Sequence, residues 1–175
     1  TSLAGQVVGN GIIVDVSKHF TKIIELNEEA SWVRVQPGVI RDELNLFLHP
    51  HGLYFGPETS TANRAMMGGM VGNNSCGSNS VIYRSTREHL MEVTAFLSDG
   101  TEVVFKALSL DDFHAKCELA TLEGTIYKSM RSMLSNYDNQ VEIKKEFPKK
   151  SVERRNTGYA IDLLVEMAPF TAGGE

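Results

Sequence analysis

Residues 66–77 read Met-Met-Gly-Gly-Met-Val-Gly-Asn-Asn-Ser-Cys-Gly, a composition unlike that of an ordinary helix, strand or surface loop. Four of these residues are glycine, and no charged residue occurs between Ala65 and Tyr83. An anion bound by this stretch must therefore be held by backbone N–H groups, hydroxyls and side-chain amides. Glycine lets a ligand approach the backbone closely, and nests of N–H groups bind phosphate in this way. The stretch predicts a loop that binds a phosphate-bearing ligand.

The same glycines also suit a second interpretation, in which they are contact points where a buried helix crosses a sheet. A glycine-rich loop on its own does not decide between the two. Residues 1–11, Thr-Ser-Leu-Ala-Gly-Gln-Val-Val-Gly-Asn-Gly, offer two hydroxyls and three glycines for a second phosphate contact. A terminal loop of this kind, taken alone, predicts only a flexible tail. Two such loops in one chain favour the phosphate-binding interpretation.

Composition narrows the class of protein. The chain has 175 residues, of which 42% are apolar and 22% charged, an ordinary globular mixture. A net charge of −5 disfavours binding to nucleic acid or to a membrane surface, because both need a basic field. No apolar run is long enough for a membrane span, and no signal peptide is visible. Cys76 and Cys117 are predicted to stay reduced, which indicates a cytoplasmic protein.

The two ends of the sequence predict an internal piece of a longer protein. The chain begins at Thr1 without a methionine and enters a glycine-rich segment at once. It ends in Gly-Gly-Glu after Pro169.

Strands are predicted from β-branched runs that are bounded by turn residues. Val33 and Val35 alternate with Arg34, as expected of a half-buried strand. Asp99 and Gly100 favour a tight turn between two later strands. The predicted strands are residues 12–16, 22–26, 32–36, 91–97 and 101–105.

Helices are predicted from apolar residues at helical spacing. Ile40, Leu44, Phe47 and Leu48 share one helical face, and Thr121 is a predicted N-cap. The predicted helices cover residues 40–48, 122–134 and about 159–167. His49 and His51, without acidic or cysteine partners nearby in the sequence, are predicted to be surface or capping residues. Strands and helices do not alternate regularly, so the sequence predicts an α+β fold.

Six segments resemble, in order and spacing, the FAD-binding domain of the FAD-linked oxidases, a flavin fold of vanillyl-alcohol-oxidase type. They are residues 1–6, 35–39, 55–58, 67–77, 83–88 and 97–100. Within the family the resemblance is to the branch of D-lactate dehydrogenase, the glycolate oxidase flavin subunit and D-2-hydroxyglutarate dehydrogenase. It implies that residues 1–106 are the second lobe of an FAD-binding domain, with a mixed or antiparallel sheet flanked by helices. Residues 107–175 are then a mostly helical continuation toward the substrate region.

The resemblance also implies a site. FAD binds without a covalent link, and its pyrophosphate lies between the loops at residues 1–6 and 68–77. The residues that the resemblance assigns to the cofactor are Thr1, Ser2, Leu3, Ala4, Gly5, Gln6, Pro57, Glu58, Thr59, Gly68, Gly69, Met70, Asn73, Asn74, Ser75, Gly77 and Tyr83. The flavin accepts hydride from a small-molecule D-2-hydroxy acid of the lactate, glycolate or 2-hydroxyglutarate class. No catalytic base and no metal ligands are identified, so the piece alone is expected to be inactive.

Some positions depart from the family pattern. Arg84 stands where a glycine commonly follows the tyrosine, and the later Gly-Ser-Glu-Gly-Thr-Leu-type motif has no counterpart. Residues 154–162 resemble the lead-in to that motif, or else they form a helix start capped by Asn156 or Thr157. Two other functions remain open: a sugar or aldonolactone oxidase on the same domain, and a nucleotide-binding or interaction module without activity.

Overall fold

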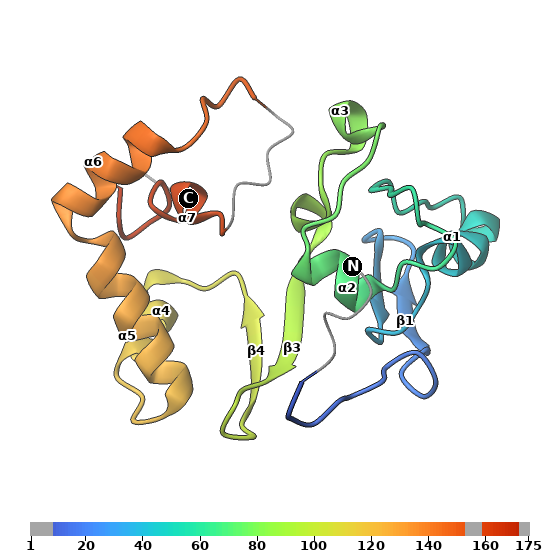
Figure 1. Cartoon of the computed structure of the whole chain (residues 1–175), viewed down its shortest axis with the longest axis horizontal. Helices are drawn as coiled ribbons and strands as arrows, with labels where there is room; N and C mark the ends of the chain where they lie inside the picture. Colours follow the sequence, from blue (N-terminus) through green and yellow to red (C-terminus); the bar gives the residue numbers. More distant parts are fainter. Residues whose placement is uncertain (1–8, 153–158, 172–175) are drawn as a thin grey trace. The chain divides into compact units, whose positions relative to one another are not determined.

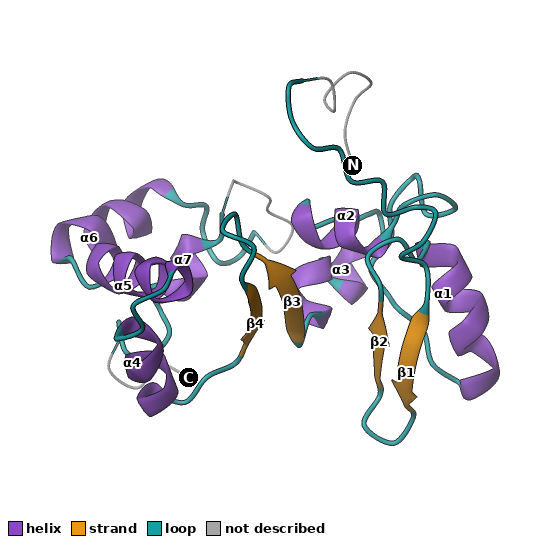
Figure 2. Cartoon of the chain, turned by 90° about the horizontal axis from the view of Figure 1, so that it is seen from below, coloured by secondary structure: helices purple, strands orange, loops and turns teal. Residues whose placement is uncertain are grey.

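The computed structural model of the protein describes residues 9–152 and 159–171. The chain divides into two units, Thr1–Leu90 and Met91–Glu175, in which helices and small antiparallel sheets occur together (Figures 1 and 2). The predicted α+β class is confirmed. The division falls earlier than residue 106, where the resemblance implies the end of the FAD-binding domain, and that domain boundary stays a prediction.

The first unit contains the predicted hairpin. Strands β1 (Ile23–Asn27) and β2 (Trp32–Val35) pair antiparallel, with Ile23 opposite Val35. The Asn27 side chain accepts a hydrogen bond of 2.8 Å from the Ala30 N–H and so stabilises the turn. Val33 and Val35 are half-buried while Arg34 is exposed, so the predicted alternation is confirmed.

Helix α1 (Arg41–Leu48) follows the hairpin, as predicted. Leu44 and Leu48 are buried, and acidic residues in the first turn favour the helix through its dipole. A 3₁₀ turn, η1 (His49–His51), continues the helix before Gly52 ends it with φ +68°. His49 and His51 are exposed, as predicted, and His51 Nδ1 lies 2.8 Å from Glu28 Oε1, a residue 23 positions away in the sequence.

The glycine-rich stretch begins as a helix rather than as a loop. Helix α2 (Met67–Gly72) inserts Met67 and Met70, one helical turn apart, into the core of the first unit. Burying a methionine of this kind stabilises the fold by about 1.5–3 kcal/mol, which accounts for the helix despite its glycines. The buried core consists of Val39, Leu44, Leu48, Ala65, Met67 and Met70.

Two short helical segments complete the described part of the first unit. They are helix α3 (Ser80–Tyr83) and the 3₁₀ helix η2 (Thr86–His89). Ser85 begins η2 with a capping box, in which its N–H donates to the Glu88 carboxylate at 3.0 Å.

The predicted buried strand at residues 12–16 is wrong. The segment forms no strand, and the side chains of Ile12, Ile13 and Val14 are 95%, 69% and 69% exposed. β-branched residues favour a strand only where a neighbouring strand covers them. The described residues supply no such neighbour for this segment.

The second unit opens with the other predicted hairpin. Strands β3 (Glu92–Phe96) and β4 (Glu102–Lys106) pair antiparallel in unbroken register. Asp99 accepts a hydrogen bond of 2.9 Å from the Thr101 N–H, and Gly100 takes φ +83°. These are the roles that the two turn residues predict.

Four helices follow β4: α4 (Leu110–Cys117), α5 (Leu122–Leu134), α6 (Tyr137–Glu146) and α7 (Ile161–Leu164). The side chain of Thr121 caps α5 as predicted, since it accepts a hydrogen bond from the Gly124 N–H. Helix α5 ends at Leu134, and α6 begins with Asn136 as its cap, whose side chain accepts a hydrogen bond from the Asn139 N–H. Helix α7 is shorter than the predicted helix, and Asn156 and Thr157 lie outside the described residues.

Leu134, Ile143 and Val165 form the buried core of this helical part. Cys117 is fully buried, Cys76 is half-buried, and neither forms a disulfide within the described residues.

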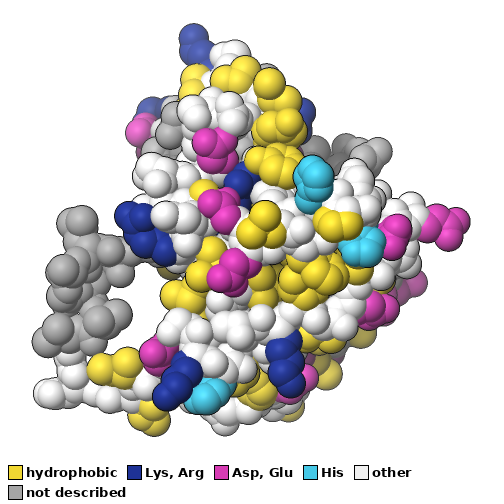
Figure 3. All heavy atoms as spheres, turned by 90° about the vertical axis from the view of Figure 1, so that its right-hand side faces the viewer, with side chains coloured by type: hydrophobic (Ala, Val, Ile, Leu, Met, Phe, Trp, Pro, Cys, Tyr) yellow, Lys and Arg dark blue, Asp and Glu magenta, His cyan; other side chains and the backbone are white. Residues whose placement is uncertain are grey.

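Charged side chains of both signs are interspersed with hydrophobic ones on the face drawn in Figure 3, where no broad basic field is present. None of the described helices combines the length and the apolar character that a bilayer-spanning segment requires.

Candidate cofactor-binding site

The residues predicted to bind the cofactor fall into three groups along the chain. Residues 1–6 lie outside the described part of the chain. The other two groups, residues 57–59 and 68–83, both belong to the first unit.

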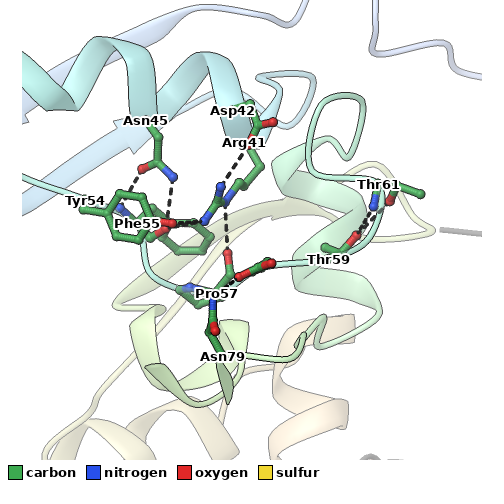
Figure 4. Close-up of polar contacts among 10 residues, drawn as sticks. Arg41, Asp42, Asn45, Tyr54, Phe55, Pro57, Thr59, Thr61 and Asn79 are labelled. Atoms are coloured by element: carbon green, nitrogen blue, oxygen red, sulfur yellow. Dashed lines mark hydrogen bonds and ion pairs between the residues drawn. The ribbon is translucent and has the colours of Figure 1, made fainter. Parts of the chain in front are cut away.

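The structure brings these two groups together. A Cβ added to Gly77 would lie 2.6 Å from the carbonyl oxygen of Glu58, so only glycine permits the two backbones to approach this closely. The Asn79 side-chain amide also donates to the Glu58 carboxylate, and Figure 4 shows Asn79 beside the segment through Pro57. Residues 57–59 and 77–79 therefore form one surface.

Helix α1 holds the segment that leads into this surface (Figure 4). Arg41 Nε donates to the Pro57 carbonyl oxygen at 3.1 Å, and Arg41 Nη2 donates to the Phe55 carbonyl oxygen at 3.3 Å. Asn45 pairs twice with the Phe55 backbone, accepting from its N–H at 2.7 Å and donating to its carbonyl oxygen at 3.2 Å. Pro57 is fully buried as a result of this packing.

The Arg41 side chain is buried, with 7% of the residue exposed. Burial on its own lowers the pKa of the guanidinium, but hydrogen bonds to Asp42 and Tyr54 outweigh burial and raise that pKa above its ordinary value. Arg41 is therefore a permanent cation inside the first unit. Its charge is compensated by Asp42, 2.9 Å away, and by the carbonyl dipoles.

The glycine stretch uses most of its backbone donors within the chain. The Gly68 N–H donates to the Pro37 carbonyl oxygen at 2.8 Å, and the Met70 N–H donates to Met66. The N–H groups of Asn73, Asn74 and Ser75 donate to Gly69, Val71 and Met70. The predicted nest of available N–H groups is wrong for these five residues, because Pro37 satisfies the Gly68 N–H, and carbonyl oxygens of residues 66–71 satisfy the other four. Cofactor contacts by these residues must run through side chains or through close approach to the backbone.

Gly68 and Gly72 have different roles within α2. A Cβ on Gly68 would lie 2.6 Å from the Pro37 Cβ, so this glycine serves packing, as the alternative interpretation holds. A Cβ on Gly72 would meet nothing within 4 Å, and the residue is exposed. At Gly72 the backbone is open to a ligand.

Of the polar residues after α2, Asn74 and Ser75 hold η2 in place, whereas Asn73 is exposed. Asn74 takes φ +45° and its side chain accepts from the Arg87 N–H at 2.9 Å. Ser75 is buried, and its carbonyl oxygen accepts from the N–H and the hydroxyl of Thr86. Both residues therefore hold η2 in place. Asn73 is exposed, and its side-chain amide donates to the Ser75 hydroxyl at 3.4 Å.

Tyr83 is anchored at two points. A Cβ on Gly56 would lie 2.5 Å from Tyr83 Cδ1, so the ring lies directly on Gly56. The Tyr83 carbonyl oxygen contacts His89 Nε2 at 2.7 Å. Tyr83 as a whole residue stays 39% exposed.

The site contains one buried polar atom without a partner. Ser80 is 5% exposed and its hydroxyl makes no hydrogen bond. A buried hydroxyl in this state is costly unless a ligand or water satisfies it. An uncharged donor set with an open glycine backbone fits a dinucleotide cofactor, whose phosphates bind such groups.

The sequence did not point to Arg41 and Asn45, the residues that hold this segment. A signal was present for Arg41, which lies three and seven positions before Leu44 and Leu48 and so shares their apolar face. A charged residue at such a position indicates a buried polar contact. Its partners Tyr54, Phe55 and Pro57 were not recognisable, because they lie 13 to 16 positions away.

Comparison with known proteins supplies the identity of the ligand. Residues 1–106 match the family model of the FAD binding domain. A D-2-hydroxyglutarate dehydrogenase of Pseudomonas putida is 40% identical over 161 residues, which is 91% of this chain and 15% of that protein. One of Escherichia coli is 41% identical over 130 residues, which is 74% of this chain and 13% of that protein.

A second group of relatives matches a shorter part of the chain. The mitochondrial D-lactate dehydrogenase (cytochrome) of Kluyveromyces lactis is 37% identical over 110 residues, which is 61% of this chain and 19% of that protein. The resemblance read from the sequence is confirmed. The chain spans less than a fifth of the length of each of these three relatives.

Proposed function

The chain belongs to the family of FAD binding domains, and from this premise we propose that it is part of an FAD-dependent dehydrogenase of D-2-hydroxy acids. The bound flavin supplies the acceptor for hydride from C2 of the substrate. Lactate, glycolate and 2-hydroxyglutarate are the substrate class, and 2-hydroxyglutarate is the first candidate.

The choice of 2-hydroxyglutarate rests on how much of the chain is similar to each group of relatives. The match of 161 residues to a D-2-hydroxyglutarate dehydrogenase includes much of the chain after residue 106, beyond the FAD binding domain. The match to the D-lactate dehydrogenase extends over 110 residues. The cofactor loops bind FAD and do not select the substrate. Similarity beyond the FAD binding domain therefore supports 2-hydroxyglutarate, the substrate named for the D-2-hydroxyglutarate dehydrogenases.

The described residues have two tasks in this function. The uncharged donors on the surface of residues 57–59 and 77–79, with Asn73 and Gly72, bind and orient the cofactor. Such contacts avoid the entropy cost of ordering long lysine side chains. We propose that the cofactor is dissociable, because neither Cys76 nor a histidine stands at a position that supports a covalent link.

Substrate anchoring is assigned to other parts of the protein. Within residues 56–83 the only charged side chains are Glu58 and Arg64. The Glu58 carboxylate accepts the Asn79 amide, and Arg64 donates to the neighbouring Asn63 at 2.9 Å. Neither group is available as a dedicated carboxylate or hydroxyl anchor, so residues 1–175 alone are expected to be inactive.

A cytoplasmic location is part of the proposal, supported by the expectation that Cys76 and Cys117 stay reduced. The net charge of −5 supports a small-molecule substrate rather than a nucleic-acid partner. Two other functions fit the domain: a sugar or aldonolactone oxidase, and a nucleotide-binding module without activity.

A substrate panel tests the proposal. The full-length polypeptide that carries this chain is purified, its flavin absorbance is recorded, and it is mixed anaerobically with each substrate. Bleaching of the flavin by D-2-hydroxyglutarate, with weaker responses to D-lactate and glycolate, is expected. Bleaching by an aldonolactone alone would favour the oxidase, and a protein without flavin would favour the inactive module.

A further inference from the structure

We propose that Arg41 is a positioning residue of the FAD site, which closes the loop of residues 57–65 at both ends and thereby fixes the cofactor surface. The inference rests on the proposed function, since it concerns the same cofactor. Arg41 itself is not assigned a contact with FAD.

Arg41 makes a hydrogen bond at each end of the loop of residues 57–65. The Arg41 backbone N–H donates to the Ala65 carbonyl oxygen at 2.9 Å, at the end of the loop that leads into α2. The Arg41 side chain donates to the Pro57 carbonyl oxygen at 3.1 Å, at the start of the loop. The loop between these two bonds contains Glu58 and Thr59, which are predicted cofactor residues.

The guanidinium holds the loop entrance through a set of directed bonds (Figure 4). Besides Pro57, it contacts the Phe55 carbonyl oxygen and the Tyr54 hydroxyl, the latter at 2.6 Å. It also lies over the Tyr54 ring, 5.1 Å from the centroid. A planar fork with five N–H donors can satisfy these partners together, whereas the compact ammonium of lysine cannot.

A shift of the Pro57 backbone would also move Glu58, which is part of the predicted cofactor surface. Glu58 follows Pro57, and its carboxylate and carbonyl oxygen are the points at which Asn79 and Gly77 meet residues 57–59. Because the backbones of Glu58 and Gly77 are in contact, they cannot shift independently. Loss of the bond from Arg41 therefore loosens both predicted cofactor segments.

The rest of the first unit does not depend on the guanidinium in the same way. The hairpin β1–β2 and the residues Leu44, Leu48 and Met70 are held by their own hydrogen bonds and by apolar packing. A change at Arg41 that keeps the positive charge is thus expected to alter the site more than the fold.

The test compares Arg41→Lys and Arg41→Met with the wild type in the full-length polypeptide. Arg64→Lys is the matched control, because Arg64 is exposed and its guanidinium donates to the neighbouring Asn63. The measurements are the dissociation constant of FAD, the visible spectrum of the bound flavin, and the far-ultraviolet circular dichroism of each protein.

We expect Arg41→Met to weaken FAD binding about tenfold or more, with Arg41→Lys intermediate and Arg64→Lys unchanged. The bound-flavin spectrum of the Arg41 variants should shift toward that of free FAD while the circular dichroism stays native. Wild-type affinity and spectrum in Arg41→Lys and Arg41→Met would overturn the inference. If Arg41→Met is insoluble, Arg41→Lys decides alone, and an unfolded Arg41→Lys would make Arg41 a residue of the fold and overturn the inference as well.

The same experiment separates the two proposals. A wild-type protein that retains FAD but shows no effect of Arg41 overturns only the positioning role. A wild-type protein without affinity for FAD overturns the cofactor assignment on which that role rests.

Discussion

Gly68 lies directly against Pro37: a Cβ on Gly68 would come within 2.6 Å of the Pro37 Cβ and 3.3 Å of its Cα. The Gly68 N–H also donates to the Pro37 carbonyl oxygen at 2.8 Å. Helix α2 and the turn after β2 therefore meet at a point that has no room for a side chain. The contact fixes the start of α2, from which the cofactor residues follow.

Gly68→Ala should destabilise the first unit. Overpacking against Pro37 costs about 1–3 kcal/mol, and the gain in helix propensity returns at most about 1 kcal/mol. Urea unfolding of the 175-residue protein measures the change. Gly72→Ala is the control, because its added methyl group meets nothing within 4 Å and should leave stability equal or slightly higher. Equal stability of Gly68→Ala and wild type would refute the packing role.

Gly69→Val should abolish retention of FAD in the full-length polypeptide without unfolding it. Gly69 is exposed in α2 and is not part of the buried core of the first unit. A Cβ with two methyl groups would occupy space where the backbone is predicted to meet the cofactor. Flavin absorbance per folded protein measures retention, and Gly69→Ala should give a smaller loss. Full flavin content in Gly69→Val would show that Gly69 does not face the cofactor.

Glu88 should make the first unit sensitive to acid. Partial burial raises the pKa of its carboxyl, but hydrogen bonds from Ser85 and from backbone N–H groups, with the charge of Arg87, outweigh burial and lower that pKa below 4.5. A lowered folded-state pKa means that the stabilisation is present above pH 4.5 and is lost as the pH falls through the folded-state value.

The measurement for Glu88 is the midpoint of urea unfolding as a function of pH. Glu88→Gln should be less stable than wild type above pH 4.5, and the difference should shrink at lower pH. Glu29→Gln, at an exposed site in the β1–β2 turn, removes the same charge as a control. A pH-independent difference between Glu88→Gln and wild type would contradict the assignment.

The elements that sequence predicted best are those whose determinants are local. Asp99 and Gly100 define their turn within a few residues, and Thr121 caps α5 three residues from its partner Gly124. Such contacts are visible in a linear pattern. Residues 12–16 failed because a strand also requires a neighbour, which the pattern does not contain.

The candidate site was likewise predictable from the sequence only where its determinants are local. The composition of residues 66–77 and the order of six motifs identified the FAD-binding family. The separate roles of Gly68 and Gly72 were not predictable, since they depend on Pro37 and on open space. The part played by Arg41 depends on carbonyl groups that only the folded chain brings to it.

The central claim is that hydride passes from C2 of a D-2-hydroxy acid to the flavin of the full-length protein. The most direct measurement is the anaerobic rate of flavin reduction by D-2-hydroxyglutarate, compared with the same substrate deuterated at C2 and with the L-enantiomer. We expect fast reduction by the D-acid, reduction slowed several-fold by deuterium, and almost none by the L-acid, because an anchored substrate presents one face to the flavin. Equal rates with both enantiomers, or no reduction by any 2-hydroxy acid, would contradict it.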